Sequence, residues 1–190
     1  RLQANEADVQ LYARLAGSVI YANASLRADA SILGKNRQGQ SGLWRFAISG
    51  DLPIVLLRIA DLANIDLVRQ LLQAHAYWRL QGLAVDLVIL CEDREGRPSP
   101  LHEQITKLIA AGGEANRVDQ PGGIFVRPAD KIDDADRILL QTVARVVIRD
   151  SGESLAEQLD GCRGTPTSIP PRPSARSGGN GTPVAVVSAH

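Results

Sequence analysis

The chain has 190 residues, of which 44% are hydrophobic and 22% charged, which is enough for one ordinary domain, or for one domain with a tail. Its 21 basic and 21 acidic side chains balance, so no net field favours nucleic acid or anionic lipid, and an aromatic content of 4% argues against a base-stacking surface. No apolar run approaches the ~20 residues of a membrane-spanning helix, so we expect no direct membrane contact from this segment.

The cysteines and methionines give two further expectations. Cys91 and Cys162 form no metal-ligand spacing, and we expect neither a metal site nor another cofactor. Methionine is absent even from position 1, so we expect the chain to be a piece of a longer polypeptide.

The first expected element is an amphipathic helix that begins after Asn5. Asn5 can cap it, and Glu6 and Asp8 fall in its first turn, where the helix dipole favours acidic side chains. Its apolar residues recur at i, i+3 and i+4 spacing: Val9, Tyr12, Leu15, Ala16, Val19 and Ile20. A connector of mixed polarity follows, so residues 1–34 are expected to form a leading helix and connector.

A strand–helix–strand unit comes next. Residues 54–59 and 85–90 are two runs that are apolar on both alternations, and a helical pattern over residues 65–80 lies between them, with Asn64 as its expected cap. The right-handed crossover of such a unit favours parallel strands that are covered on both faces.

The alternation continues with a short helix near residues 101–109 and a third strand at residues 124–126. A helix then opens at Asp133, and its apolar spacing runs on through Val146 and Val147. The predicted fold class is α/β: a small three-stranded, mainly parallel sheet with packed helices, preceded by the amphipathic helix.

The expected domain organisation follows from these elements and from a change in composition near the end. Residues 35–160 are predicted to form the α/β module. Residues 161–190 are rich in Pro, Gly and Ser, and we expect a disordered tail there.

Arg58 and Asp86 each interrupt an apolar strand, and an unpaired charge in such a place is costly. We interpret them as a buried structural pair across adjacent strands. The alternative is that Asp86 lies at a strand end and faces a ligand. His75 falls on the apolar stripe of its helix and is interpreted as a core histidine with a backbone partner rather than a general base.

Candidate ligand-binding residues are Trp44, Arg45 and Asp51, because tryptophan, arginine and aspartate are often used together to bind sugars. The competing interpretation is structural: Gly50 forms a turn, and Asp51 accepts backbone N–H bonds ahead of the strand. No residue is assigned a catalytic role. No GxGxxG follows the first two strands and no GxxxxGK[ST] occurs, so nucleotide binding rests on the α/β pattern alone.

Three stretches of the chain carry a family resemblance: SGLWRFAISGDLPIVLLRI, AHAYWRLQGLAVDLVIL and IFVRPADKIDDADRILLQTVARVVI. They resemble the bacterial cyclic β-1,2-glucan synthases, in which a membrane glycosyltransferase is joined to a cellobiose-phosphorylase-like region (glycosyltransferase family 36 or glycoside hydrolase family 94). The resemblance covers roughly residues 6–159 and fades after SLAEQL.

The resemblance implies that this segment is an internal, non-catalytic connecting module of a carbohydrate enzyme. It would position the catalytic domains, with flanking domains of the parent and possibly β-glucan as partners, in the cytoplasmic part of a bacterial inner-membrane protein. The motif around the family's catalytic aspartate is not matched, so we expect the segment alone to be inactive. Two alternatives stay open: a small carbohydrate- or nucleotide-binding module, which predicts that Trp44 or Trp78 lies at the surface, and a stand-alone enzyme.

Overall fold

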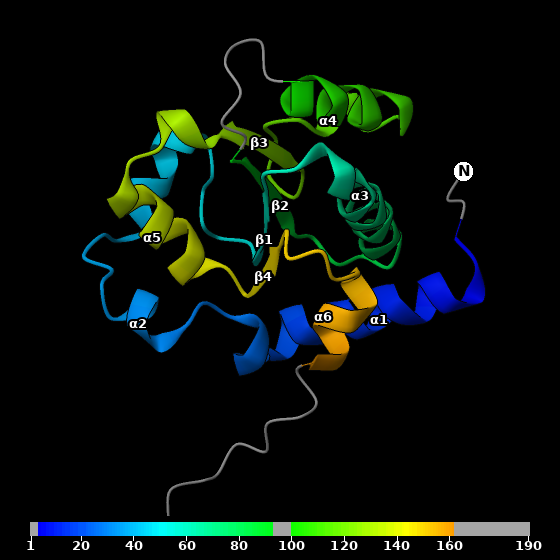
Figure 1. Cartoon of the computed structure of the whole chain (residues 1–190), viewed down its shortest axis with the longest axis horizontal. Helices are drawn as coiled ribbons and strands as arrows, with labels where there is room; N and C mark the ends of the chain where they lie inside the picture. Colours follow the sequence, from blue (N-terminus) through cyan, green and yellow to red (C-terminus); the bar gives the residue numbers. More distant parts are fainter. Residues whose placement is uncertain (1–3, 93–99, 162–190) are drawn as a thin grey trace, which may run out of the picture.

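The structure, a computed structural model, describes residues 4–92 and 100–161. At its centre is a four-stranded sheet in which all strand pairs are parallel, in the order β3-β2-β1-β4. The strands are β1 (Ile54–Ile59), β2 (Asp86–Cys91), β3 (Ile124–Pro128) and β4 (Val146–Arg149). Figure 1 shows the sheet between two groups of helices.

The prediction of three strands is wrong, because residues 146–149 form a fourth strand instead of continuing a helix. Helix α5 (Asp134–Val143) ends where Ala144 turns to an extended conformation, with φ −61° and ψ 130°. Val146 and Val147 are β-branched and pair with Val55 and Leu56 of β1. A β-branched run packs well on the pleated surface of a sheet, and here that preference outweighs the helical spacing of the apolar residues.

Helices cover both faces of the sheet (Figure 1). One face packs against α1 (Glu6–Tyr21), α3 (Ile65–Leu80), α4 (Pro100–Ala111) and α6 (Leu155–Gly161). The other packs against α5 and two 3-10 helices, η2 (Gln40–Phe46) and η5 (Ala129–Lys131). The remaining short helices are η1 (Ala24–Leu26), α2 (Ala30–Leu33), η3 (Leu62–Asn64) and η4 (Ala115–Arg117).

Successive strand residues point to opposite faces of the sheet, and both sets are apolar because both faces are buried. Along β1, Val55 and Leu57 contribute to the core under α3, whereas Ile54 and Leu56 contribute to the core under α5. The chain moves from β1 to β2 and β3 in one direction and then returns to the far side of β1, which places α5 on the opposite face from α3 and α4.

Helix α1 shares the core with the sheet. Asn5 and Asp8 form a capping box at its start, as the sequence predicts for Asn5. Tyr12 is buried against α3, and its backbone carbonyl accepts a 2.8 Å hydrogen bond from the indole Nε1 of Trp78. The leading helix therefore packs on one face of the sheet. The tail predicted from residue 161 lies outside the described residues from residue 162 onwards.

Each outer strand of the sheet has a local cover. Beside β3, Val118 forms a single parallel bridge to Ile124, and the backbone N–H of Asp119 donates to the Ile124 carbonyl. Beside β4, the side-chain amide of Gln158 accepts from the backbone N–H of Arg149 at 3.1 Å and donates to its carbonyl at 2.8 Å. These contacts reduce the number of backbone N–H and C=O groups that are left without a partner along the outer strands of an open sheet.

Candidate functional site

The carboxyl end of the sheet contains the place where open α/β sheets usually bind ligands. The strand order reverses between β1 and β4, and ligands bind in the crevice outside the strand ends at such a switch point. Asp150 follows β4 there, and its carboxylate accepts hydrogen bonds from the backbone N–H groups of Ala60 (2.9 Å) and Asp61 (2.8 Å). The side-chain amide of Asn64, the expected helix cap, also donates to Asp150. The Asp150 carboxylate therefore already accepts the hydrogen bonds that these N–H groups could offer to a ligand.

Arg58 is engaged at the same end of the sheet. Its guanidinium binds Glu92 through two hydrogen bonds, Nε to Oε1 at 2.8 Å and Nη2 to Oε2 at 3.1 Å. A third bond of 3.1 Å joins Nη1 to the Gln141 side chain on α5. The arginine charge is therefore neutralised by a neighbouring side chain rather than directed at an open site.

The predicted Arg58–Asp86 pair is not formed, and this corrects the sequence interpretation. In the register of β1 and β2, Ile54 lies opposite Asp86 and Arg58 lies opposite Leu90, so the two charges are at opposite ends of the strands. The sequence shows that each residue interrupts a strand, but it does not show how the two strands align. Glu92, one residue beyond β2, is the partner that reaches Arg58.

Asp86 lies at the amino end of β2 with no exposed surface. Its Oδ1 accepts a 2.7 Å hydrogen bond from the backbone N–H of Gly122, and among the described residues Oδ2 has no hydrogen-bond partner. Burial raises the pKa of the Asp86 carboxyl, the Gly122 hydrogen bond opposes this, and the nearby Asp51 charge adds to it. Asp86 is therefore a buried carboxyl at a strand end, not half of an ion pair.

His75 is buried on α3, as the sequence predicts. Its Nε2 lies 3.0 Å from the backbone carbonyl of Val85, which can only accept, so Nε2 carries the hydrogen. Burial lowers the pKa of His75, and the bond to Val85 only partly offsets this. With its carbonyl partner and no open surface, this imidazole is not placed to act as a general base.

The three candidate ligand-binding residues lie in or after η2, and Asp51 is the one of the three that lines the cavity described below. Trp44 is 66% exposed, whereas Trp78 is buried. Arg45 forms a 2.8 Å ion pair with Asp136 of α5. Asp51 accepts a 3.1 Å hydrogen bond from the Gln40 side chain. Their role in ligand binding stays a prediction.

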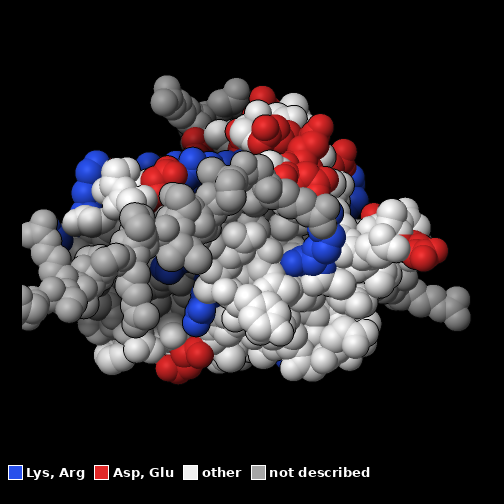
Figure 2. All heavy atoms as spheres, turned by 90° about the horizontal axis from the view of Figure 1, so that it is seen from below, with Lys and Arg blue, Asp and Glu red and all other residues white. Residues whose placement is uncertain are grey.

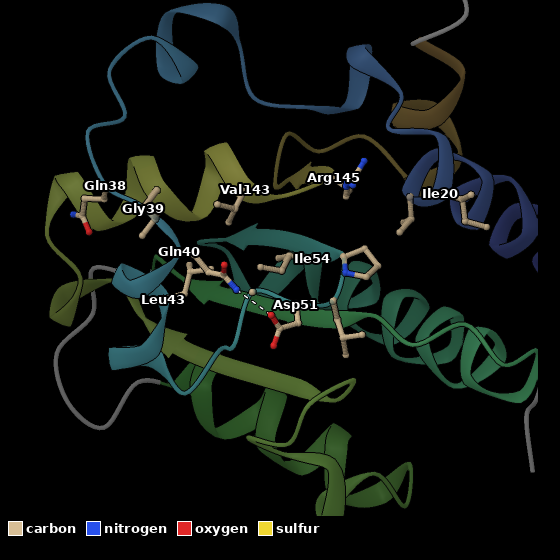
Figure 3. A pocket seen from close by; sticks show the side chains of 14 residues that line it. Ile20, Gln38, Gly39, Gln40, Leu43, Asp51, Ile54, Val143 and Arg145 are labelled. Atoms are coloured by element: carbon tan, nitrogen blue, oxygen red, sulfur yellow. Dashed lines mark hydrogen bonds between the residues drawn. The ribbon is translucent and has the colours of Figure 1, made fainter.

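A cavity of about 450 Å³ opens at the amino ends of β1 and β4 (Figure 3). Its polar lining comes from Gln38, Gln40, Asp51 and Arg145, and Leu43 and Val143 belong to its apolar lining. Asp51 enters from the turn before β1, and Arg145 comes from the connection between α5 and β4. Small-molecule sites typically measure roughly 300–1,000 Å³, so this cavity is large enough to be one.

Sequence reasoning selected Asp51 but missed Arg145. Arg145 precedes a run of β-branched residues, and only when that run is read as a strand does the arginine fall at the amino end of the sheet, where it lines the same cavity as Asp51. The β-branched run Val146–Val147–Ile148 is the feature of the sequence that could have indicated this strand.

Two kinds of feature are absent from the described residues. Over residues 4–92 and 100–161, no group of three or more His, Cys, Asp or Glu side chains is arranged to hold a metal ion. Within the same ranges, no helix combines the length and the apolar character that crossing a bilayer requires.

A comparison with curated proteins finds a partial relative. A stretch of 74 residues, 39% of this chain, is 42% identical to the cyclic beta-(1,2)-glucan synthase NdvB of Rhizobium meliloti (strain 1021). The matched stretch covers only 3% of that protein's length. No family model matches the chain. Part of the chain is therefore related in sequence to a segment of a glucan synthase, and it spans a small share of that enzyme.

Proposed function

We propose that this chain is a non-catalytic α/β module of a cyclic β-1,2-glucan synthase-like enzyme, in which it connects and positions the catalytic parts. The sequence match to a small segment of a much longer synthase supports the parent class. The cellobiose-phosphorylase-like architecture of the parent, and its place in the cytoplasmic part of an inner-membrane protein, rest on the family resemblance.

One observation carries the non-catalytic part of the proposal. At the switch point, Asp150 occupies the backbone donors of Ala60 and Asp61, and the Arg58 charge is held by Glu92. A phosphate group or a sugar nucleotide would have to displace a carboxylate that is already hydrogen-bonded there. A negative side chain in that crevice also repels an anionic ligand, which argues against the nucleotide-binding alternative.

The surface at the amino ends of the strands, opposite the switch point, supports a connecting role. Helix α3 returns the chain to the amino end of β2, so Leu80, at its last position, lies on the amino side of the sheet. Ile20 of α1 lines the amino-edge cavity, and Tyr21 follows it. Tyr21 is 85% exposed and Leu80 72% exposed. Figure 2 views the molecule from below, the side on which β4, α1 and α6 lie in Figure 1, and shows few charged side chains over much of the described surface there. Exposed apolar area of this kind marks interaction surfaces.

The activity assay tests the non-catalytic part. The purified chain is incubated with sugar-nucleotide donors, and separately with β-glucan and inorganic phosphate, and product formation is followed. We expect no turnover above buffer. Turnover that co-purifies with the protein and disappears in Asp51→Asn or His75→Gln would contradict the proposal.

The connecting role is tested in a synthase polypeptide that contains this module. The double variant Tyr21→Ser, Leu80→Ser should lower glucan synthesis severalfold, because the module would lose apolar contact with its neighbours. The matched control is Leu62→Ser, which removes an exposed leucine at the carboxyl end of β1. Equal activity in both variants would remove the support for a docking surface.

A second candidate function, a carbohydrate-binding module, is favoured by one observation. The exposed Trp44 offers the aromatic surface that such a module requires, although the buried Trp78 does not. Titrating soluble β-glucan while recording tryptophan fluorescence separates the candidates. A binding module predicts a change that is lost in Trp44→Ala, and a connecting module predicts none.

A further inference from the structure

We infer that the amino-edge cavity binds a neutral sugar unit, with Arg145, Asp51 and Gln40 as its polar contacts. This inference goes beyond the proposed function, because a connecting module needs no ligand. It also concerns a different surface from Trp44, which does not line the cavity.

The first argument is the unused hydrogen-bonding capacity inside the cavity. Among the described residues, no hydrogen bond or ion pair engages the Arg145 guanidinium, although its backbone N–H donates to the Ile54 carbonyl. Asp51 receives a side-chain hydrogen bond only at Oδ1. Arg145 thus offers several N–H donors and Asp51 a free acceptor, and no ion pair joins the two side chains.

The second argument is that the acceptors are held in place before a ligand arrives. Gln40 donates through Nε2 to the Ser49 carbonyl at 2.8 Å and to Asp51 Oδ1 at 3.1 Å, as the dashed line in Figure 3 shows for the latter. This leaves the Gln40 Oε1 as an acceptor. Gly50 closes the turn with φ +79°, and a Cβ there would come within 2.9 Å of Gln40 and Leu43. Such preorganisation lowers the entropy cost of binding.

The third argument selects the class of ligand. A hydroxyl group both donates and accepts, so adjacent hydroxyls can use an arginine donor and a carboxylate acceptor in one site. An anion such as phosphate would face the Asp51 charge, and a simple cation would face Arg145. The apolar side chains Leu43, Leu139 and Val143 offer a surface for the C–H face of a ring. Opposite charges, neutral amides and an apolar wall together match a neutral polyhydroxylated ring.

The test is binding of small ligands to the full chain by isothermal titration calorimetry. The probes are glucose and a set of neutral glucose disaccharides that covers the β linkages, with glucose 6-phosphate, glucosamine and glycine as anionic, cationic and zwitterionic comparisons. We expect at least one neutral sugar to bind more tightly than all three comparisons. Arg145→Met and Asp51→Asn should each weaken that binding about tenfold, the loss of one good polar contact of ~1.4 kcal/mol.

The controls separate loss of contact from loss of fold. Lys131→Met removes an exposed cation that does not line the cavity and should leave affinity unchanged. Arg145→Met should keep the thermal unfolding midpoint, because the guanidinium has no partner among the described residues. Tighter binding of a charged comparison, no binding of any neutral sugar, or sugar binding that survives both cavity variants would each overturn the inference. None of these results bears on the activity assay above, so the two proposals fail separately.

Discussion

Two buried ionisable side chains, Asp86 and His75, lie near the amino end of β2, and burial shifts their pKa values in opposite directions. Burial raises the pKa of the Asp86 carboxyl above its ordinary value of 3.8 and lowers the pKa of the His75 imidazole below 6.5. In both cases the folded protein favours the neutral form, because a charge without full solvation is costly in the interior.

The Asp86 carboxyl should make the protein less stable as the pH rises. Between the unfolded pKa near 3.8 and the higher folded pKa, the folded state binds more protons than the unfolded state, so this group's contribution to stability is present at lower pH and is lost as the pH rises through the folded pKa. Asp86→Asn keeps an acceptor for the Gly122 N–H without a charge. We expect denaturant unfolding of this variant to show a smaller loss of stability with rising pH than the native chain. A loss as steep as in the native chain would show that Asp86 does not cause the pH dependence.

The His75 imidazole should act in the opposite sense. Its folded pKa lies below the unfolded value of 6.5, so its contribution is present above that value and is lost as the pH falls through the folded pKa. Denaturant unfolding at intervals from pH 7.5 to 5 measures this contribution, which lowers stability as the pH falls, whereas the Asp86 carboxyl acts in the opposite sense. In His75→Gln, whose amide can still donate to the Val85 carbonyl, the slope should be smaller. An unchanged slope in that variant would assign the pH dependence to other groups.

At the scale of elements, the turn after β4 is held to the turn after β1 by one carboxylate. Asp150 joins the two segments through the N–H groups of Ala60 and Asp61 and the side chain of Asn64. These bonds fix how β1 leads into α3, so Asp150 stabilises the crossover as well as filling the crevice.

Asp150→Ala should therefore be costly. Losing bonds to a charged acceptor, at backbone donors that water can still reach, should lower the free energy of unfolding by about 1.5–3 kcal/mol. The matched control is Asp160→Ala, which breaks a 2.6 Å surface ion pair with Arg14 and should cost about 0–1 kcal/mol. Equal effects of the two substitutions in denaturant unfolding would show that the Asp150 contacts are no stronger than an ordinary surface pair.

The elements that the sequence predicts well are those whose apolar pattern has one interpretation. The continuous runs in β1 and β2 and the stripe of α3 leave little choice, and the βαβ unit follows. The segment from Ile138 to Val147 fits helical spacing along its whole length, so the strand at its end was missed. Tertiary context decides that segment, because Val146 and Val147 pair with β1.

The candidate site was less predictable than the fold. Strand register is set by the geometry of the crossover, and without it Arg58 was assigned to Asp86 rather than to Glu92. The cavity needs both β4 and the turn at Gly50, so only its Asp51 side was visible in the sequence. The exposure of Trp44 likewise depends on how η2 packs, since the neighbouring Leu43 and Phe46 are buried.

At the scale of the whole molecule, association should occur through the amino side rather than through the sheet edges. An open sheet has two outer strands, but Val118 and Gln158 each cover part of one of them here. The largest exposed apolar side chains on the amino side are Tyr21 and Leu80. A formal net charge of zero provides little repulsion between copies.

Sedimentation over a range of concentrations should then show weak reversible association of the isolated chain. Because burial of apolar surface drives it, association should persist or increase at high salt, whereas pairing through charges would weaken. Tyr21→Ser combined with Leu80→Ser should shift the protein toward monomer, and Leu62→Ser should not. Gln158→Ala, which uncovers the Arg149 backbone, separates the two routes: stronger association in that variant than in the native chain would show that the edge of β4 is also a contact surface. A compact monomer at all concentrations would mean that the amino side needs no cover, and the carbohydrate-binding module would become the better-supported function.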